Sequence, residues 1–335
     1  MQRKKLGRTG LEVSILGFGC GTVGGLMTRG DVRDQARAVA RAIDLGINYF
    51  DTAAQYGEGA SETSLGRALQ SVTADIIVAT KVKVPDIGTP NVRTGQIGAA
   101  VISSLEASLK RLGRDHVDLF QLHNAIATTE RKGCLLPEQA LEQVVPAMQR
   151  LRADGKLRCF GMTGLGDTPA MLRLVDAGVF ATAQIPLNLL NPSPLRAVPD
   201  GYPAQDYACM LERMMQAGMG GVGIRMMAGG ALSGAAIHPL ARGTVDPMGS
   251  GSSFAADQAR AQRFEALVKD GHADSLGHAA IRYVMANEAI ATLLVGLSGS
   301  EQLEDAARAI AAGPLTAAGL ARVAAIQDSF LGEPR

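Results

Sequence analysis

Short apolar segments alternate with helix-length segments along almost the whole chain, and this alternation restricts the possible folds most strongly. Continuous apolar strands of this kind are typical of parallel sheets that helices cover on both faces. Eight strand–helix units predict an α/β fold, a closed (β/α)8 or TIM barrel. The segments rich in Val, Ile, Leu or Phe are residues 15–19, 47–51, 76–81, 117–123, 158–162, 181–186, 221–225 and 290–296.

The segments between these strands have spaced apolar positions, as amphipathic helices do. In the first of them, we expect Val32, Ala36, Val39, Ala40 and Ile43 to form the buried side. The predicted helices are residues 32–45, 62–69, 94–112, 136–153, 169–177, 206–217, 256–286 and 300–312. The segment 256–286 is long enough for either one helix or two.

Three segments lie outside this alternation. Residues 4–13 contain Gly7-Arg8-Thr9-Gly10 between two extended pieces, which predicts a β-hairpin before the barrel. Residues 229–254 are rich in Gly, Ser and Pro and follow the seventh strand, so we expect a functional loop at the C-terminal face. Residues 315–327 predict one further helix at the C-terminal end. No linker or internal repeat interrupts the pattern, so residues 1–335 are predicted to form a single barrel domain.

Charge and hydropathy argue against several classes of protein. Lys and Arg number 33 and Asp and Glu number 32, so the net charge of +1 gives no electrostatic reason to expect nucleic acid or a membrane surface as partner. No apolar run approaches the roughly 18 residues that span a bilayer, and residues 1–5 lead into no signal-peptide segment. Cys20, Cys134, Cys159 and Cys209 have no paired spacing, which indicates reduced thiols and a cytoplasmic location.

Residues 19–24 match the glycine pattern G-x-G-x-x-G of doubly wound dinucleotide-binding folds. In that fold the glycines open a helix, whose N-terminus holds the pyrophosphate. Here residues 25–30 intervene, and Asp31 is the expected N-cap of the next helix. An open doubly wound sheet is therefore the less favoured alternative to the barrel.

Polar side chains end three of the predicted strands, and a tyrosine follows one of them. Asp51, Lys81 and His123 each close an apolar segment, and Tyr56 lies in the loop after Asp51. Reactive groups of barrel enzymes lie at these strand ends. Each residue also has a structural explanation, as a helix cap, a solvated charge, a hydrogen-bonded core histidine or a tyrosine packed on the barrel rim.

Taken together, the four side chains suit proton transfer coupled to hydride transfer. A tyrosine hydroxyl has a pKa of about 10, and a neighbouring ammonium favours its phenolate. A carboxylate holds that lysine charged and in place, and a histidine can steer a carbonyl oxygen towards the phenol. Such a set moves a proton to or from an oxygen while hydride moves to or from its carbon.

The motifs around these residues resemble those of the aldo-keto reductase superfamily. The signature containing Asp51 and Tyr56 is residues 46–57, and Lys81 and His123 end the matching stretches 79–81 and 112–123. The resemblance extends over almost the whole chain. It implies an NAD(P)-dependent oxidoreductase acting on a carbonyl compound or sugar, with Tyr56 as general acid and base and with Asp51, Lys81 and His123 completing the catalytic set.

The same resemblance implies a cofactor site along the C-terminal face of the barrel. The implied cofactor-binding residues are Gly19, Cys20, Thr163, Gly164, Gln184, Ile224, Arg225, Met226, Met227, Ala228, Gly230, Leu232, Gly296, Ser298, Gln302, Asp305 and Ala306.

Some of these positions depart from the common family pattern. Thr163-Gly164 stands where many relatives have Ser-Asn, and it is similar to a subgroup that oxidises sugars to lactones. Residues 224–227 replace the usual Tyr-Ser-Pro-Leu, so an aliphatic side chain stands in the place of the aromatic one. NADP(H) is the family default, but no basic residue stands at Ser298, which favours NAD(H) or weak discrimination. Ser300 is expected to cap the helix that follows.

Two other function classes remain open at this point. Relatives of this fold serve as channel-associated subunits with slow turnover, so an interaction subunit is the alternative function. A metal-dependent hydrolase ranks last, because only His272 and His278 have spacing that resembles a ligand pair. We expect no metal, and a small-molecule carbonyl or sugar substrate as the partner.

Overall fold

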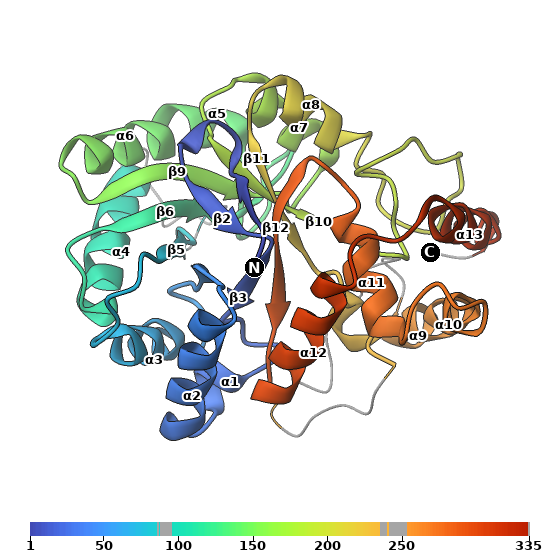
Figure 1. Cartoon of the computed structure of the whole chain (residues 1–335). Coiled ribbons are helices and arrows are strands. Elements are labelled where there is room, and N and C mark those ends of the chain that lie inside the picture. Colours follow the sequence, from blue (N-terminus) through green and yellow to red (C-terminus); the bar gives the residue numbers. More distant parts are fainter. Residues whose placement is uncertain (86, 88–95, 235–239, 241–252, 334–335) are drawn as a thin grey trace.

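Eight parallel strands close into a barrel, as the sequence predicts (Figure 1). The computed structural model describes residues 1–85, 87, 96–234, 240 and 253–333. Neighbours around the ring follow the order β10-β11-β12-β3-β4-β5-β6-β9, and β9 closes on β10, so the open sheet is excluded. The barrel strands are β3 (Leu16–Gly19), β4 (Tyr49–Asp51), β5 (Ile77–Val82), β6 (Val117–Leu122), β9 (Leu157–Thr163), β10 (Thr182–Pro186), β11 (Gly220–Ile224) and β12 (Ile290–Gly296).

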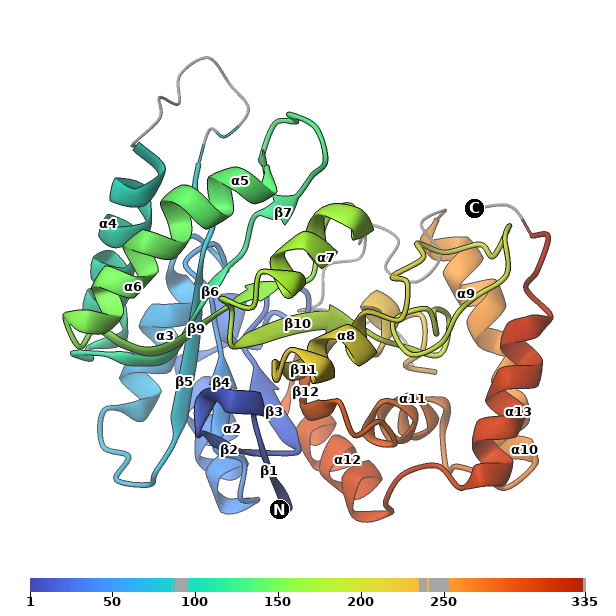
Figure 2. The same cartoon turned by 90° about the horizontal axis from the view of Figure 1, so that it is seen from above.

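Helices surround the strands, and most of the apolar core lies between the two layers (Figures 1 and 2). No described helix is long and apolar enough to cross a membrane. The helices are α1 (Leu26–Arg29), α2 (Val32–Asp44), α3 (Ala60–Leu69), α4 (Gln96–Leu112), α5 (Pro137–Gln139), α6 (Val145–Ala153), α7 (Thr168–Asp176), α8 (Met210–Gln216), α9 (Phe254–Arg263), α10 (Glu265–Lys269), α11 (Leu276–Met285), α12 (Ser300–Ala311) and α13 (Ala317–Asp328).

The predicted hairpin closes the end of the barrel at which the strands begin. Strands β1 (Arg3–Lys5) and β2 (Glu12–Ser14) pair antiparallel, and the hairpin lies across the ring of strands in Figure 1. Leu6, Leu11 and Val13 are buried in the cluster that fills the barrel interior. Gly7 has a φ of +51°, and a Cβ there would lie 2.2 Å from the Gly220 nitrogen, so only glycine permits this approach.

The guanidinium of Arg8 fastens this hairpin to the barrel. It donates hydrogen bonds to the carbonyl oxygens of Ala217 and Gly178 at 2.6 Å each and of Phe180 at 2.7 Å. These carbonyls lie on the segments that lead into β11 and β10, so one side chain joins the hairpin to two strands of the ring.

Two predicted helices are divided in the structure. The helix predicted at residues 136–153 consists of α5, a π-helical turn (Ala140–Val144) and α6, because Pro146 has no N–H to donate and its ring crowds the preceding turn. Residues 256–286, predicted to form one helix or two, form three helices, α9, α10 and α11. Gly271, at a φ of +76°, ends the second, and Ser275 caps the third by accepting a bond from the His278 nitrogen.

The buried face of α2 differs from the prediction. Val32 is 49% exposed, and Ala36 and Ala40 are also exposed, whereas Gln35 is 4% exposed. The Gln35 amide can be buried because it is satisfied, since its Nε2 donates to the carbonyls of Leu26 and Gly30 at 3.1 and 3.0 Å.

The expected caps have opposite outcomes. Asp31 caps α2, as predicted, by accepting a bond from the Arg33 nitrogen. Ser300 does not cap α12, because it is already the first helical residue and Gly299 occupies the cap position. Instead, Gln302 Oε1 accepts a bond of 2.7 Å from the Ser298 nitrogen.

Parts of two predicted segments, the start of residues 94–112 and most of residues 229–254, lie outside the described residues.

Candidate active site

Three neighbouring strands bring the predicted catalytic residues together at their C-terminal ends. Asp51 ends β4, Lys81 lies near the end of β5, and His123 directly follows β6. Tyr56 reaches the same point from the loop between β4 and α3. The rings of Tyr56 and His123 meet edge to face, with centroids 5.7 Å apart and planes at 85°.

The Lys81 ammonium is fully buried and lies among oxygen acceptors. It forms an ion pair with Asp51 Oδ1 and donates to the Thr52 carbonyl at 2.8 Å and to the Tyr56 hydroxyl at 3.2 Å. Lys81 thereby links the Asp51 carboxylate to the Tyr56 phenol. Its ammonium, held by the carboxylate, can stabilise the negative charge of the phenolate when Tyr56 loses its proton.

Two amides hold the other oxygen of the Asp51 carboxylate. Gln184 Nε2 donates to Oδ2 at 2.6 Å, and Gln121 Nε2 donates to the same atom at 3.2 Å. Gln121 was not among the predicted site residues, although a polar residue two positions before His123 on an apolar strand shares its inward face. Gln184 was expected to meet the cofactor, but its amide N–H is directed at Asp51, which leaves the amide oxygen for a ligand.

Burial and the contacts among these side chains together set the proton affinities of this cluster. Burial raises the pKa of Tyr56 above its ordinary value, and the nearby Lys81 charge offsets this only in part. Burial also works to lower the pKa of Lys81, but Asp51 and Tyr56 outweigh it, so the pKa of Lys81 is raised. Near neutral pH the site therefore holds a charged lysine beside a neutral phenol.

His123 is neutral over the same range of pH. Burial, reinforced by the positive charges of Lys81, Lys83 and Arg225, lowers its pKa to about 3. A neutral imidazole can donate one hydrogen bond to a substrate oxygen without competing for the proton on Tyr56.

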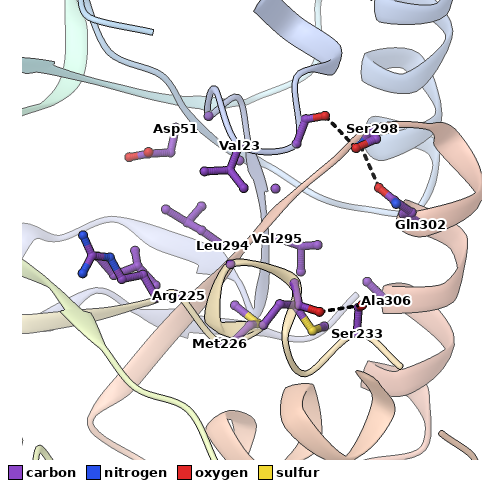
Figure 3. A pocket seen from close by; sticks show the side chains of 18 of the residues that line it. Val23, Asp51, Arg225, Met226, Ser233, Leu294, Val295, Ser298, Gln302 and Ala306 are labelled. Carbon is purple, nitrogen blue, oxygen red and sulfur yellow. Dashed lines mark hydrogen bonds between the residues drawn. The ribbon is translucent and has the colours of Figure 1, made fainter. Parts of the chain in front are cut away.

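A cavity of about 740 Å³ extends from this cluster along the C-terminal face to α12 (Figure 3). Most of the expected cofactor-binding residues line this cavity. The predicted residues that line the cavity are Asp51, Tyr56, His123, Gly19, Thr163, Gln184, Ile224, Arg225, Met226, Met227, Gly230, Gly296, Ser298, Gln302, Asp305 and Ala306.

Five predicted residues do not line the cavity. Lys81, at 0% exposure, reaches it only through Tyr56, and Ala228 and Leu232 pack into the core beneath the loop after β11. Cys20 is also buried, and its carbonyl accepts a bond of 2.9 Å from the Ser61 hydroxyl. Gly164 adjoins β10, where its nitrogen donates to the Gln184 carbonyl at 2.7 Å.

The glycine-rich segment after β3 lines the cavity and leads directly into a helix. This helix, α1, has Gly25 as its N-cap, whereas residues 25–30 were expected to contain no helix before the Asp31 cap. A Cβ on Gly24 would lie 2.5 Å from the backbone of Leu297, so glycine is required for the segment to cross so close to the end of β12. The Ser298 hydroxyl donates to the Gly24 carbonyl at 2.6 Å (Figure 3). The Leu26 nitrogen donates to the Leu297 carbonyl at 3.0 Å.

The end of the cavity at α12 is acidic, a feature that was not predicted from the sequence. Glu301 and Asp305 line it, together with the cation of Arg308. Arg308 donates to Asp305 at 2.7 Å, and His278 Nε2 lies 3.1 Å from the same oxygen. Helical spacing puts Glu301, Asp305 and Arg308 on one face of α12, and this periodicity is the sequence signal from which the acidic end could have been predicted.

Among the described residues, no group of three His, Cys, Asp or Glu side chains is arranged to hold a metal ion.

Comparison with known proteins agrees with this architecture. The sequence profile of the Aldo/keto reductase family matches residues 15–328. The chain is 29% identical to L-galactose dehydrogenase of Arabidopsis thaliana over 317 residues, covering 92% of this chain and 88% of that protein. It is 37% identical to a putative voltage-gated potassium channel subunit beta of Schizosaccharomyces pombe over 165 residues, covering 47% of this chain and 43% of that protein.

A solved aldo-keto reductase from Bacillus halodurans, in its holo form, superimposes with a TM-score of 0.74 and 23% identity, covering 99% of this chain and 98% of that one. That likeness supports the fold. The family match covers nearly the whole chain and identifies the protein as an oxidoreductase. The chain thus belongs to the aldo/keto reductase family of oxidoreductases.

Proposed function

We propose that the protein oxidises the hemiacetal carbon of a sugar to a lactone with a nicotinamide cofactor, and catalyses carbonyl reduction in the reverse direction. The observation that carries the proposal is the chain of contacts from Asp51 through Lys81 to the Tyr56 hydroxyl at the wall of the cavity. The sugar assignment is supported by Thr163-Gly164 and by the similarity to an L-galactose dehydrogenase over most of both chains.

The proposed reaction balances with one hydride and one proton. The C–H bond of the hemiacetal carbon breaks and its electron pair leaves as hydride, while the O–H proton passes to the Tyr56 oxygen and on to solvent. When bound, the oxidised nicotinamide supplies the hydride acceptor. His123 donates a hydrogen bond to the substrate oxygen, and Lys81 stabilises the phenolate that takes the proton.

The cavity has features that fit a dinucleotide. Backbone segments approach closely at Gly24, polar side chains line both ends, and the aliphatic Ile224 stands where the family commonly stacks an aromatic residue. Thr163 and the Gln184 amide oxygen are the groups we assign to a carboxamide. Ser298 and Gln302 border the segment we assign to the adenosine part.

The acidic end of the cavity favours NAD(H) over NADP(H). Glu301 and Asp305 face the region, and its one described cation, Arg308, is already paired with Asp305. A 2′-phosphate would meet two carboxylates, whereas a ribose hydroxyl can donate to one of them. Ser298 cannot replace the missing cation, because it is 5% exposed and bonded to Gly24.

Charge reversal at Glu301 tests this cofactor assignment. We expect Glu301→Lys to tighten NADP(H) relative to NAD(H) by about 10-fold, since it removes a like charge and adds a phosphate partner. Calorimetric titration of both cofactors measures the ratio. Glu304→Lys is the matched control, because it makes the same charge change on α12 but Glu304 pairs with Arg41 outside the cavity. An equal shift in both variants would contradict the assignment.

The proton affinities predict the pH dependence of the two directions. Reduction requires a neutral Tyr56, whose pKa is raised, so its rate should stay level through neutral pH and fall only in alkali. Oxidation requires the phenolate and should rise with pH over the same range. His123, with a pKa of about 3, should add no inflection between pH 5 and 8. Profiles of kcat/KM in both directions test this, and an inflection near pH 6.5 would show a titrating histidine.

A screen with NAD and NADP in both directions, against sugars, aldehydes and ketones, tests the function itself. Turnover of sugar hemiacetals to lactones supports the proposal. Cofactor binding without turnover of any of these substrates would favour the interaction-subunit alternative.

A further inference from the structure

Arg225 places a cation at the catalytic end of the cavity. It is the first residue after β11, is half-buried, and lines the same cavity as Tyr56 and His123. Figure 3 shows its guanidinium on the Asp51 side, at the end away from Ser298, Gln302 and Ala306. A charge at this position faces whatever molecule the catalytic cluster acts on.

The backbone of Arg225 is held in an uncommon conformation. Its φ is +59°, in the left-handed region that a side chain with a Cβ occupies only at a cost. Two hydrogen bonds to its carbonyl oxygen maintain the turn, from the Ala228 nitrogen at 2.8 Å and from Asn188 Nδ2 at 3.2 Å. The turn therefore fixes the direction in which the side chain leaves the strand.

The guanidinium has no anionic partner among the residues that the structure describes. Over the described ranges it forms no hydrogen bond or ion pair, and its charge acts instead on His123 and on the buried Tyr207, whose pKa values it works to lower. The carboxylate nearest to the catalytic end, Asp51, is already occupied by Lys81 and two amides.

Both remaining carboxylates of the cavity wall lie at its other end. Glu301 and Asp305 belong to α12, and Asp305 is paired with Arg308. The catalytic end thus carries an unpaired positive charge, and the opposite end an excess of negative charge. A guanidinium that is half-buried and unpaired gains most from an oxyanion that it can bind through two N–H groups.

We propose that Arg225 binds a carboxylate on the substrate, so that the preferred substrate is a sugar or small carbonyl compound bearing an acidic group. This proposal rests on the function proposed above and narrows its substrate class. The diphosphate of the cofactor offers the same kind of anionic oxygen, and the experiment below separates the two sources.

The test compares pairs of substrates in which a carboxylate replaces one uncharged terminal group. D-galacturonate and D-galactose share one ring and differ at C6, and succinate semialdehyde and butanal form a second pair for the reductive direction. We expect the wild-type protein to have the higher kcat/KM for the charged member. In Arg225→Gln this preference should fall about 10- to 100-fold, and Arg225→Lys should retain part of it.

Cofactor binding separates the two sources of the anion. If Arg225 contacts the substrate, Arg225→Gln should leave the Kd for NAD, measured by calorimetry, within about twofold of wild type. A weakened NAD affinity with equal losses for both members of each pair would assign the guanidinium to the diphosphate and overturn the proposal. A wild-type protein that prefers neither member would also overturn it, while leaving the proposed function intact.

Binding without turnover provides an independent measurement. Calorimetric titration of D-galacturonate into the protein saturated with NAD should show binding that Arg225→Gln weakens, even if no substrate in either pair is turned over. That result would contradict the proposed function but support the inference, and no binding would overturn the inference. Arg308→Gln is the matched control, since it removes a cation from the far end, and it should leave the preference for the charged substrate unchanged.

Discussion

Replacing Tyr56 by Phe should lower kcat by about 10²- to 10⁴-fold, the range that general acid–base catalysis contributes. The change removes the hydroxyl that lies 3.2 Å from the Lys81 ammonium and removes little volume. The fold and the cofactor affinity should therefore persist. Steady-state kinetics with calorimetric cofactor titration measures both quantities.

A matched tyrosine controls for the loss of a buried hydroxyl. Tyr49 lies on β4, the strand that precedes the Tyr56 loop, and is fully buried, but its hydroxyl has no hydrogen-bond partner among the described residues. Tyr49→Phe should leave kcat unchanged. Lys81→Met acts on the same proton as Tyr56→Phe, so the double variant should lose far less than the product of the single losses. Near-normal turnover of Tyr56→Phe would show that Tyr56 only packs against the barrel rim.

Asp51→Asn should impair both catalysis and folding. It leaves the buried Lys81 ammonium without its ion-pair partner, and breaking one side of a buried pair typically costs about 3–5 kcal/mol of stability. Since Asp51 helps to raise the pKa of Lys81, that pKa should fall in the variant, and a neutral lysine no longer stabilises the phenolate. We expect kcat to fall at least about 10²-fold. Denaturant unfolding and the pH profile of oxidation measure the two effects.

Asp118→Asn separates the catalytic effect from the loss of stability. Asp118 is also a buried carboxylate on a barrel strand, but it accepts a bond from the Val78 nitrogen and pairs with Arg158, away from the cavity. It should lower the free energy of unfolding while kcat per folded molecule stays unchanged. If Asp51→Asn behaved in the same way, Asp51 would have a structural role alone.

The features that the sequence predicts well are those set by local periodicity. Continuous apolar runs identify all the barrel strands within one or two residues at most ends, because burial on both faces favours apolar side chains along most of each strand. The strand-end residues Asp51, Lys81 and His123 meet because parallel strands end at one face of the barrel. The alternation of strands and helices predicts the parallel barrel, and the barrel in turn brings the residues of the catalytic cluster together.

The features that the sequence does not predict depend on partners distant in the chain. Gln35 is buried because Arg67 and two carbonyls satisfy its amide, which periodicity cannot reveal. Gln121 matters because Asp51, on another strand, accepts its N–H. The acidic end of the cavity depends on where α12 lies relative to the loop after β3, which is a matter of packing.

The hairpin below the barrel has a kinetic consequence. Lys4 bonds to the Ile290 carbonyl and Arg8 to that of Ala217, so contacts separated by 286 and 209 residues hold the hairpin in place. Such pairings form only after long loops close, and the docking of Leu6, Leu11 and Val13 should come after most of the barrel has assembled. Changes in the hairpin would then alter mainly the rate at which the native state is lost, and only slightly the rate at which it is reached.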